Sequence, residues 1–200
     1  MNVLYKTSNG ITQVSMEAKH LSKRIITIRG EITEEMANDF SGKMLELNME
    51  SEDEWITVLI NSPGGEVNSG LMIYDTIVGS KAPVRAVVMG KAYSMGAVIF
   101  ASANQRLMLP NSELMLHQPL LGGRVSGNAS SIKSISDALL ETKEKLNKIL
   151  ATHTGRTIEE LDKATSYDNY LSPPEAIEFG LCEKQIRFAD VIDFANGMEG

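Results

Sequence analysis

Short apolar segments alternate with segments of helical spacing through the first half of the chain, and this alternation is what most limits the fold. The apolar segments are rich in β-branched residues, and the segments between them carry apolar residues three and four positions apart. The expected strands are Ile25–Ile28, Trp55–Ile60 and Val84–Met89, and the expected helices are Glu34–Met49, Val67–Val78 and Ser94–Ala103. Because strands that alternate with helices pack as a parallel sheet covered by helices, the sequence predicts an α/β fold.

The second half of the chain contains one helix that is much longer than the others, predicted over Ala129–Thr154 after a polar loop at 120–128. The shorter elements are strands at Leu107–Leu109 and Glu113–Leu116, helices near Ile158–Ala164 and Pro174–Phe179, and a helix stop at Gly180. The sequence contains no internal repeat and no linker-like stretch. We therefore expect a single domain over residues 24–200, preceded by an N-terminal segment over residues 1–23.

Composition argues against several functions. A net charge of −7 at pH 7 disfavours nucleic acid, whose binding depends on Lys and Arg that neutralise phosphates. The longest apolar stretches are too short to span a bilayer, so no membrane insertion is expected. Cys182 is the single cysteine, which permits no internal disulfide and fits a reducing compartment. With no signal-peptide pattern at the start of the sequence, we expect a cytoplasmic protein.

A stripe of apolar residues runs along the predicted long helix. It steps by three and four positions and comprises Ile132, Ile135, Leu139, Leu146 and Ile149. A stripe of this kind indicates either a helix that projects and pairs with a partner chain or one that is buried along a large sheet. Its length favours the first interpretation, so these residues are predicted to form an oligomer contact.

Ser94 is a candidate nucleophile. It lies between a predicted strand and a predicted helix of small residues, with Ala92 and Gly96 two positions to either side. A hydroxyl at a helix N-terminus lies beside unpaired N–H groups, and small neighbours permit the sharp turn on which hydrolases place their nucleophile. Serine is also common as a plain helix N-cap. Taken alone, Ser94 therefore has two interpretations.

The turn Ser62-Pro63-Gly64-Gly65 is a candidate partner for this serine. Two glycines after a strand allow another backbone to approach closely, and they leave N–H groups open to an anion. An oxyanion hole needs one donor from the residue after the nucleophile and another from a separate loop. The N–H groups of Met95 and Gly65 are therefore the candidate donors, although such a turn is also a common simple connection.

A serine nucleophile needs a base, and the chain has three histidines. His20 lies in a polar, basic stretch, and His153 falls on the apolar register of the long helix, where a packing role is the simpler interpretation. His117 ends a predicted strand beside a loop, which is where α/β folds place catalytic groups. The pattern therefore favours His117. No spacing selects the orienting carboxylate among 26 Asp and Glu residues.

Several blocks of the sequence resemble the proteolytic subunit of the Clp protease, a family of serine peptidases. In chain order, they are Asn61-Ser62-Pro63-Gly64-Gly65, Tyr74-Asp75-Thr76-Ile77, Ala92-Tyr93-Ser94-Met95-Gly96-Ala97, Leu109-Pro110-Asn111-Ser112, His117-Gln118-Pro119 and Tyr167-Asp168-Asn169-Tyr170-Leu171-Ser172. The last block is followed by Glu175-Ala176 and Phe179-Gly180-Leu181. The similarity extends over Arg24 to Ile186.

The resemblance implies a role for each candidate residue. Ser94 would be the nucleophile, His117 its base and Asp168 the carboxylate that orients the base. The backbone N–H groups of Gly65 and Met95 would form the oxyanion hole. The residues implied to hold the substrate as an added strand are Gly64, Gly65, Leu120, Leu121 and Gly122. No metal or organic cofactor is implied.

The resemblance also implies a fold and an assembly. The family shares its fold, built from repeated ββα units, with the crotonases, and its members form two stacked heptameric rings. The long helix near 129–154 would be the handle that meets its counterpart in the other ring, and residues 1–23 would be a candidate axial gate. Peptides and unfolded proteins would be the substrates, delivered by an ATP-dependent unfoldase.

Two departures from the family pattern bear on these contacts. Tyr167 stands where family members usually carry an arginine that takes part in contacts between the rings. The positions that correspond to the aromatic lining of the unfoldase docking cleft are Thr57, Leu59 and Gly79, none of them aromatic. Because buried aromatic residues dominate interface energies, we expect unfoldase docking to be weak or altered.

Three other functions compete with a ring-forming serine endopeptidase. A crotonase-type acyl-CoA enzyme would use the same fold but would need neither Ser94 nor His117 at this spacing. A phage-type head-maturation peptidase would keep all three implied catalytic residues. A non-catalytic structural ring subunit would lack at least one of them, and none is missing here.

Overall fold

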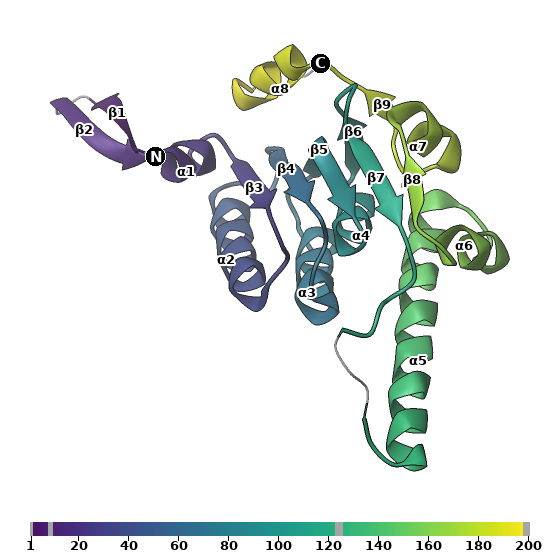
Figure 1. The fold of residues 1–200 in the computed structure, drawn as a ribbon. Coiled ribbons are helices and arrows are strands. Elements are labelled where there is room, and N and C mark those ends of the chain that lie inside the picture. The colour runs from purple at the N-terminus through teal and green to yellow at the C-terminus, as the bar shows by residue number, and fades with distance from the viewer. Residues whose placement is uncertain (1, 8–9, 123–125, 198–200) are drawn as a thin grey trace.

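The computed structural model describes residues 2–7, 10–122 and 126–197, and within them a seven-stranded sheet forms the centre (Figure 1). Its strands are β3 (Ile25–Arg29), β4 (Ile56–Ser62), β5 (Val84–Tyr93), β6 (Gln105–Met108), β7 (Glu113–Leu116), β8 (Asn169–Leu171) and β9 (Lys184–Gln185). The order is β3-β4-β5-β6-β9, with β7 paired to both β5 and β8. β7 and β8 pair antiparallel, whereas the other pairings of this sheet are parallel. The predicted α/β fold with a mainly parallel sheet is confirmed.

Helices cover both faces of this sheet. They are α1 (Met16–Leu21), α2 (Glu34–Glu50), α3 (Val67–Val78), α4 (Met95–Ala101), α5 (Ala129–Thr154), α6 (Ile158–Thr165), α7 (Pro173–Phe179) and α8 (Phe188–Ala195). Helices α2, α3 and α4 lie side by side on one face, whereas α8 lies on the other side (Figure 1). The bounds predicted for α3 and α5 are those observed, and Gly180 ends α7 in the left-handed conformation expected of a helix stop.

The two faces of the sheet carry separate hydrophobic clusters. Because successive side chains of a strand point to opposite faces, Ile60 and Val88 pack with α2, α3 and α4 in the main core. Their neighbours Leu59 and Val87 belong to a second, smaller cluster that includes Val191 of α8. The alternation explains how strands with almost continuous apolar sequence contribute to both clusters.

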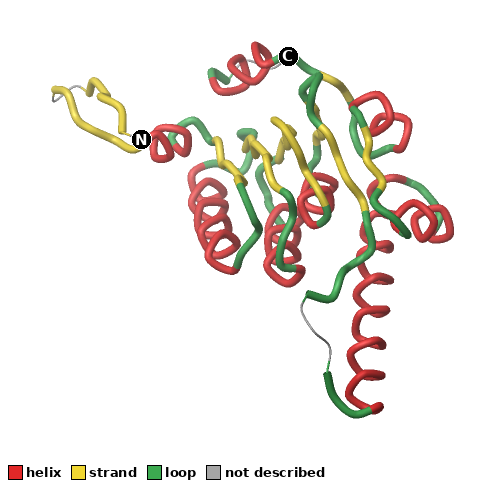
Figure 2. Tube along the Cα trace, viewed as in Figure 1, coloured by secondary structure: helices red, strands yellow, loops and turns green. Residues whose placement is uncertain are grey.

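Helix α5 divides into two parts. Its C-terminal half packs against the domain through Leu146 and Leu150, which are 7% and 2% exposed. Its N-terminal half extends away from the rest of the molecule (Figure 2). Gly155, with a φ of 71°, ends the helix in the left-handed conformation. The long helix therefore projects as predicted, but only in its first half.

Both chain ends contain elements that the sequence did not predict. The first residues form a hairpin of β1 (Asn2–Thr7) and β2 (Gly10–Ser15), followed by α1. Near the other end, α8 packs on the second cluster through Val191 and Phe194. A helix as short as α8 is marginal alone, so its existence depends on packing that local periodicity does not reveal.

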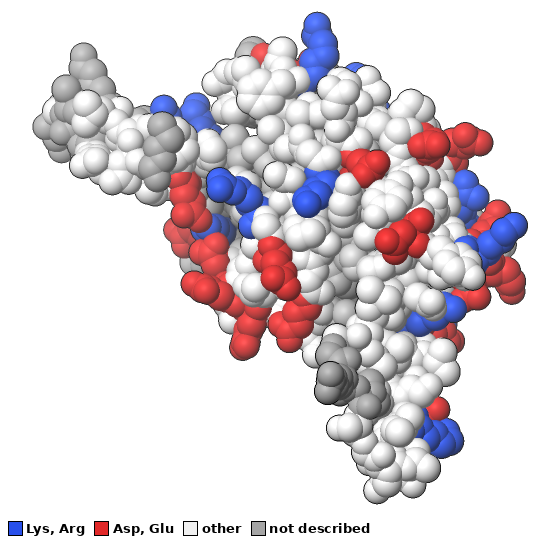
Figure 3. All heavy atoms as spheres, viewed as in Figure 1, with Lys and Arg blue, Asp and Glu red and all other residues white. Residues whose placement is uncertain are grey.

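The surface carries charge of both signs, and Figure 3 shows Asp and Glu side chains gathered along α2. This distribution gives that side of the molecule an acidic character, consistent with the net charge of −7. Across residues 2–7, 10–122 and 126–197, no helix combines the length and apolarity needed to cross a bilayer.

Candidate active site

Ser94 lies at the end of the central strand. The sequence predicted that this strand ends at Met89, but β5 continues to Tyr93 because Lys91–Tyr93 pairs with the start of β7. Ser94 follows with φ 53° and ψ −121°, a strained conformation for any residue other than glycine. Helix α4 begins only at the next residue, and the Ser94 hydroxyl makes no helix-capping hydrogen bond. Ser94 therefore occupies the N-cap position of α4, but its hydroxyl does not cap the helix.

His117 contacts Ser94 directly. Strand β7 ends at Leu116, so His117 is the first residue after it. The Ser94 backbone N–H donates to the Met115 carbonyl at 2.8 Å, which aligns the end of β5 with the end of β7. His117 Nε2 then lies 2.8 Å from Ser94 Oγ. A hydroxyl and an imidazole at this distance can exchange a proton.

Asp168 approaches the other nitrogen of the same imidazole. In the antiparallel register of β7 and β8, Leu116 lies opposite Asn169, so one further step places His117 opposite Asp168. Asp168 Oδ1 is 3.4 Å from His117 Nδ1. This distance exceeds the usual range for a hydrogen bond, although contacts in catalytic sites are often long before substrate binds. Strand pairing thus selects the one carboxylate that spacing along the sequence could not.

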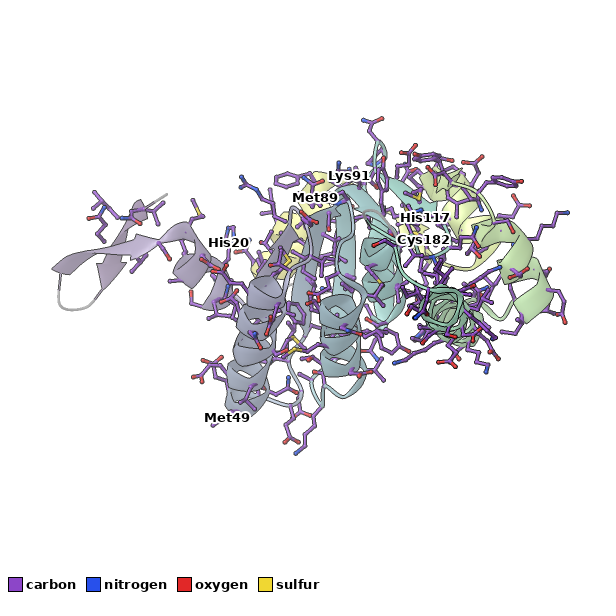
Figure 4. All side chains as sticks on the ribbon, turned by 60° about the horizontal axis from the view of Figure 1, so that its bottom comes forward. His20, Met49, Met89, Lys91, His117 and Cys182 are labelled. Atoms are coloured by element: carbon purple, nitrogen blue, oxygen red, sulfur yellow. The ribbon has the colours of Figure 1, made fainter. Side chains whose placement is uncertain are left out.

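The other two histidines lie elsewhere. His20 is beside α1 and α2, on the opposite side of the molecule from His117 (Figure 4). His153 lies near the end of α5, where its Nε2 is 2.8 Å from the Tyr74 hydroxyl. Burial, and secondarily the positive charge of Arg106, lower the pKa of His153. The structure therefore brings His117 to Ser94 and leaves His153 in the packing role that was the simpler interpretation.

Two glycines bring a second loop against the turn that holds Ser94. Gly64 and Gly65 have φ values of 94° and 155°. A Cβ at Gly64 would lie 2.8 Å from Ser94 Cβ, and one at Gly65 would lie 2.3 Å from the carbonyl oxygen of Ile32. These distances are too short for a side chain, so only glycine permits the loop to approach Ser94 this closely.

The same loop leaves a backbone donor unused. Ile32 N–H donates to the Gly64 carbonyl at 2.8 Å, and Glu66 N–H donates to the Ile32 carbonyl at 2.9 Å. Neither of these two hydrogen bonds involves the Gly65 N–H. In the described part of the chain, neither that group nor the Met95 N–H donates a hydrogen bond. Both predicted oxyanion donors are therefore available to an anion.

A cavity of about 240 Å³ adjoins Ser94 and His117. Its apolar walls are Val67, Met95, Val98, Met115, Leu146 and Leu150. Asn147 and Thr165 also line it, and sequence reasoning missed both. The signal that could have found Asn147 is its position between Leu146 and Leu150, inside the part of the long helix that packs against the domain.

The apolar stripe of α5 does not lie on one surface. Leu146 is a wall of the cavity and part of the core, so its predicted role in an oligomer contact is wrong. Ile149 packs partly against the same core, whereas Ile132 is 47% exposed and Ile135 and Leu139 are half-buried. The projecting half of α5 therefore retains the residues that could face a partner.

The predicted substrate-binding loop is described only in part. Leu120 lines the mouth of the cavity and is 73% exposed, and Leu121 and Gly122 are also exposed. The next residues of that loop, 123–125, lie outside the described residues.

A pair of tyrosines joins the strands that carry the site, and sequence reasoning did not single it out. Tyr93 of β5 donates a hydrogen bond to Glu113 of β7, and its ring packs edge-on against Tyr170 of β8. The hydrogen bond to Glu113, aided by burial, raises the pKa of Tyr93 to about 12. Because Tyr93 and Tyr170 are close neighbours of Ser94 and Asp168 in the sequence, this contact ties together the strands that position those two residues.

These elements assemble a serine, a histidine and an aspartate beside two free N–H groups and a cavity, an arrangement typical of hydrolases with a serine nucleophile. Within the described residues, no three His, Cys, Asp or Glu side chains are grouped so that they could hold a metal ion.

Comparison with known families agrees with this arrangement. The sequence model of the Clp protease family matches residues 8–188. The chain therefore belongs to the Clp protease family, and it is a peptidase of the serine type. Its mixed α/β architecture with a mainly parallel sheet is the fold of that family.

Proposed function

We propose that the chain is a serine endopeptidase in which Ser94 is the nucleophile, His117 its general base and Asp168 the group that orients the base. The observation that carries this proposal is the distance of 2.8 Å between Ser94 Oγ and His117 Nε2, at a strained turn beside two unused N–H groups. A strained residue is retained where its conformation serves a function, and here it presents the hydroxyl to the imidazole.

The proposed reaction proceeds in two stages. Ser94 Oγ attacks the peptide carbonyl while His117 Nε2 takes its proton, and the oxyanion receives hydrogen bonds from Gly65 N–H and Met95 N–H. His117 then donates the proton to the leaving amine, which departs and leaves an acyl-enzyme on Ser94. Water then attacks the acyl group while His117 takes a proton from that water. His117 returns the proton to Ser94 Oγ as the bond to the acyl group breaks, and the acid product is released.

The substrate is held as an extended strand. Gly64 and Gly65 border one side of the cleft, and the residues proposed for the other side are Leu120, Leu121 and Gly122. Recognition by main-chain hydrogen bonds depends little on side chains, so many peptide sequences are accepted. The cavity beside Ser94 receives the side chain of the residue whose carbonyl is attacked.

The active form is an oligomer, in which two stacked heptameric rings enclose a chamber. Support comes from the projecting half of α5, where Ile132 and Leu140 are 47% and 59% exposed, and from exposed Leu45 and Met49 on α2. Each such side chain contributes about 1.5–3 kcal/mol when fully buried, so covering them by other copies of the chain is favourable. The exposed Tyr167 takes the place of the arginine that usually joins the rings.

Delivery of folded proteins by an ATP-dependent unfoldase is weak. Thr57 is buried, Leu59 packs in the cluster that α8 covers, and Gly79 caps α3 without a side chain. None of these positions offers an aromatic anchor, and α8 already lies on the Leu59 side of the sheet. Short peptides should therefore be cleaved far better than folded proteins.

The deciding experiment replaces the nucleophile. Ser94→Ala should lower kcat for a short fluorogenic peptide by about 10⁶-fold, as loss of a triad nucleophile does in other serine proteases. The hydroxyl contributes little packing, so circular dichroism and native mass should be unchanged. Ser130→Ala, an exposed position on α5, is the matched control and should keep full activity. A Ser94→Ala variant with activity comparable to the parent would disprove the proposed nucleophile.

A further inference from the structure

The Asp168 carboxylate has few contacts that hold it in the proposed site. Its side chain is 57% exposed, whereas that of His117 is 14% exposed. Within the described residues, its one ion pair or hydrogen-bonding contact is with His117 Nδ1, at 3.4 Å. A group that orients a catalytic side chain must itself be held by surrounding residues. The position of Asp168 therefore depends on the segments of chain on either side of it.

The two segments that flank Asp168 are anchored differently. Before it, α6 ends at Thr165, whose carbonyl accepts a hydrogen bond from the Gln118 N–H at 2.7 Å. After it comes β8, a strand of three residues that pairs with β7 alone in the described part of the chain. A strand this short at the edge of a sheet has few backbone hydrogen bonds, so its side-chain contacts matter for its position.

The Tyr170 side chain of β8 contacts Tyr93 of β5, two strands away. The backbone register places Tyr93, Met115 and Tyr170 in one row across β5, β7 and β8. The two tyrosine rings meet edge to face, with centroids 5.7 Å apart and an interplanar angle of 85°. This geometry is one of the favourable arrangements of an aromatic pair. Since Tyr170 lies two residues after Asp168, the contact holds the strand that directly follows Asp168.

Tyr93 is itself held by two charged side chains. Its hydroxyl donates a hydrogen bond to Glu113 Oε1, and the Lys91 ammonium lies 5.4 Å from the centre of its ring. Both groups come from neighbouring positions, because Lys91 of β5 lies opposite Glu113 of β7. A hydrogen bond to a carboxylate is stronger than one between neutral groups. The Tyr93 ring is therefore a fixed support for Tyr170.

We propose that Tyr93 is a positioning residue, whose ring holds β8 so that the Asp168 carboxylate stays beside His117. Tyr93 does not line the cavity beside Ser94, so it acts through Asp168 and not on the substrate. This role rests on the proposed function, because it takes Asp168 as the group that orients His117. Loss of the orienting aspartate costs about 10⁴-fold in kcat in a well-studied serine protease, so a change in its position should have a large effect.

The first test removes the ring contact. Tyr93→Leu leaves the backbone pairing of β7 with β8 in place, so Asp168 should be displaced only in part. Because a displacement of about 1 Å can cost about 10²-fold, we expect kcat for a short fluorogenic peptide to fall by about tenfold with KM unchanged. Tyr93→Phe keeps the ring and should retain most of the parent kcat. Phe188→Leu, which changes an exposed ring on α8, is the matched control and should behave as the parent.

A double-mutant cycle separates positioning of Asp168 from a direct effect on the neighbouring Ser94. Asp168→Ala alone should lower kcat by about 10⁴-fold. Adding Tyr93→Leu to that variant should cost less than about twofold, because no carboxylate remains to be misplaced. A substitution that only distorted the turn at Ser94 would instead lower activity by the same factor in both backgrounds. Tyr170→Leu removes the other ring of the pair and should repeat both results. All variants are measured as full-length proteins in their native assembly.

Three results would overturn the role assigned to Tyr93. They are a folded Tyr93→Leu enzyme with kcat within about twofold of the parent, equal losses from Tyr93→Leu in the parent and in Asp168→Ala, and a Tyr93→Phe enzyme as impaired as Tyr93→Leu. If Tyr93→Leu fails to fold by circular dichroism, Tyr170→Leu and its combination with Asp168→Ala decide the question.

The same measurements distinguish this role from the proposed function. An Asp168→Ala enzyme with kcat within about tenfold of the parent would contradict the proposed role of Asp168, and the role of Tyr93 would fall with it. A loss of about 10⁴-fold in Asp168→Ala, without any effect of Tyr93→Leu in the parent, would contradict only the role of Tyr93.

Discussion

Replacing Gly65 by alanine would push a methyl group into the backbone of Ile32. A Cβ at residue 65 would lie 2.3 Å from the Ile32 carbonyl oxygen and 2.6 Å from its nitrogen, whereas ordinary contacts begin at 3.4 Å. The two backbones must therefore separate by about 1 Å, a displacement that can cost about 10²-fold when it misplaces groups around a reacting centre. Loss of one oxyanion donor costs about 10²–10³-fold in kcat. We expect Gly65→Ala to lower kcat by about two to three orders of magnitude.

The assay is steady-state hydrolysis of a short fluorogenic peptide, with kcat and KM determined separately. The loss should fall mainly on kcat, because the Gly65 N–H is proposed to act on charge that develops during attack. Gly42→Ala is the matched control, since a Cβ there has no atom within 4 Å and alanine favours the helix. Circular dichroism and thermal unfolding establish whether the variants are folded. A folded Gly65→Ala enzyme with kcat within threefold of the parent would refute the role assigned to this loop.

Three further predictions concern assembly, the α8 contact and the buried thiol. Ile135→Asp, on the projecting half of α5, should reduce native mass by light scattering and lower peptidase activity; an unchanged, fully active assembly would rule out this helix as the contact. The Arg85 guanidinium lies 3.7 Å from the Phe194 ring and 4.7 Å from that of Trp55, the single tryptophan. Phe194→Ala should therefore lower the free energy of unfolding by about 1–2 kcal/mol and shift the fluorescence of Trp55. Phe188→Ala, exposed on the same helix, should do neither, and equal effects of both variants would contradict the contact. Burial raises the pKa of the Cys182 thiol to about 11, so a thiol reagent at pH 8 should modify the folded protein about 10²-fold more slowly than the unfolded chain; equal rates would show that the thiol is accessible.

Local signals in the sequence were sufficient for much of the fold. The bounds of α3 and α5 were predicted because apolar periodicity and the residues that end helices act over a few positions. His117 was favoured for a similar reason, since it lies where a predicted strand meets a loop, whereas the same kind of signal at Ser94 left two interpretations open. α8 was missed because its stability comes from Val191 and Phe194 packing on strands that lie far away in the sequence.

The amino-acid sequence by itself determined the alternation of strands and helices, the long helix, and the positions of a serine and a histidine beside predicted turns, because apolar spacing and turn-forming residues are local features of the chain. Only the tertiary structure decided which carboxylate approaches His117, since the pairing of β7 with β8 brings in Asp168 from a distant segment. It also divided one apolar stripe, placing Leu146 in the core and Ile132 at the surface. The reason is physical. The spacing of apolar side chains along the chain is set by the helix or strand that carries them, whereas the residues they contact are set by which elements pack together.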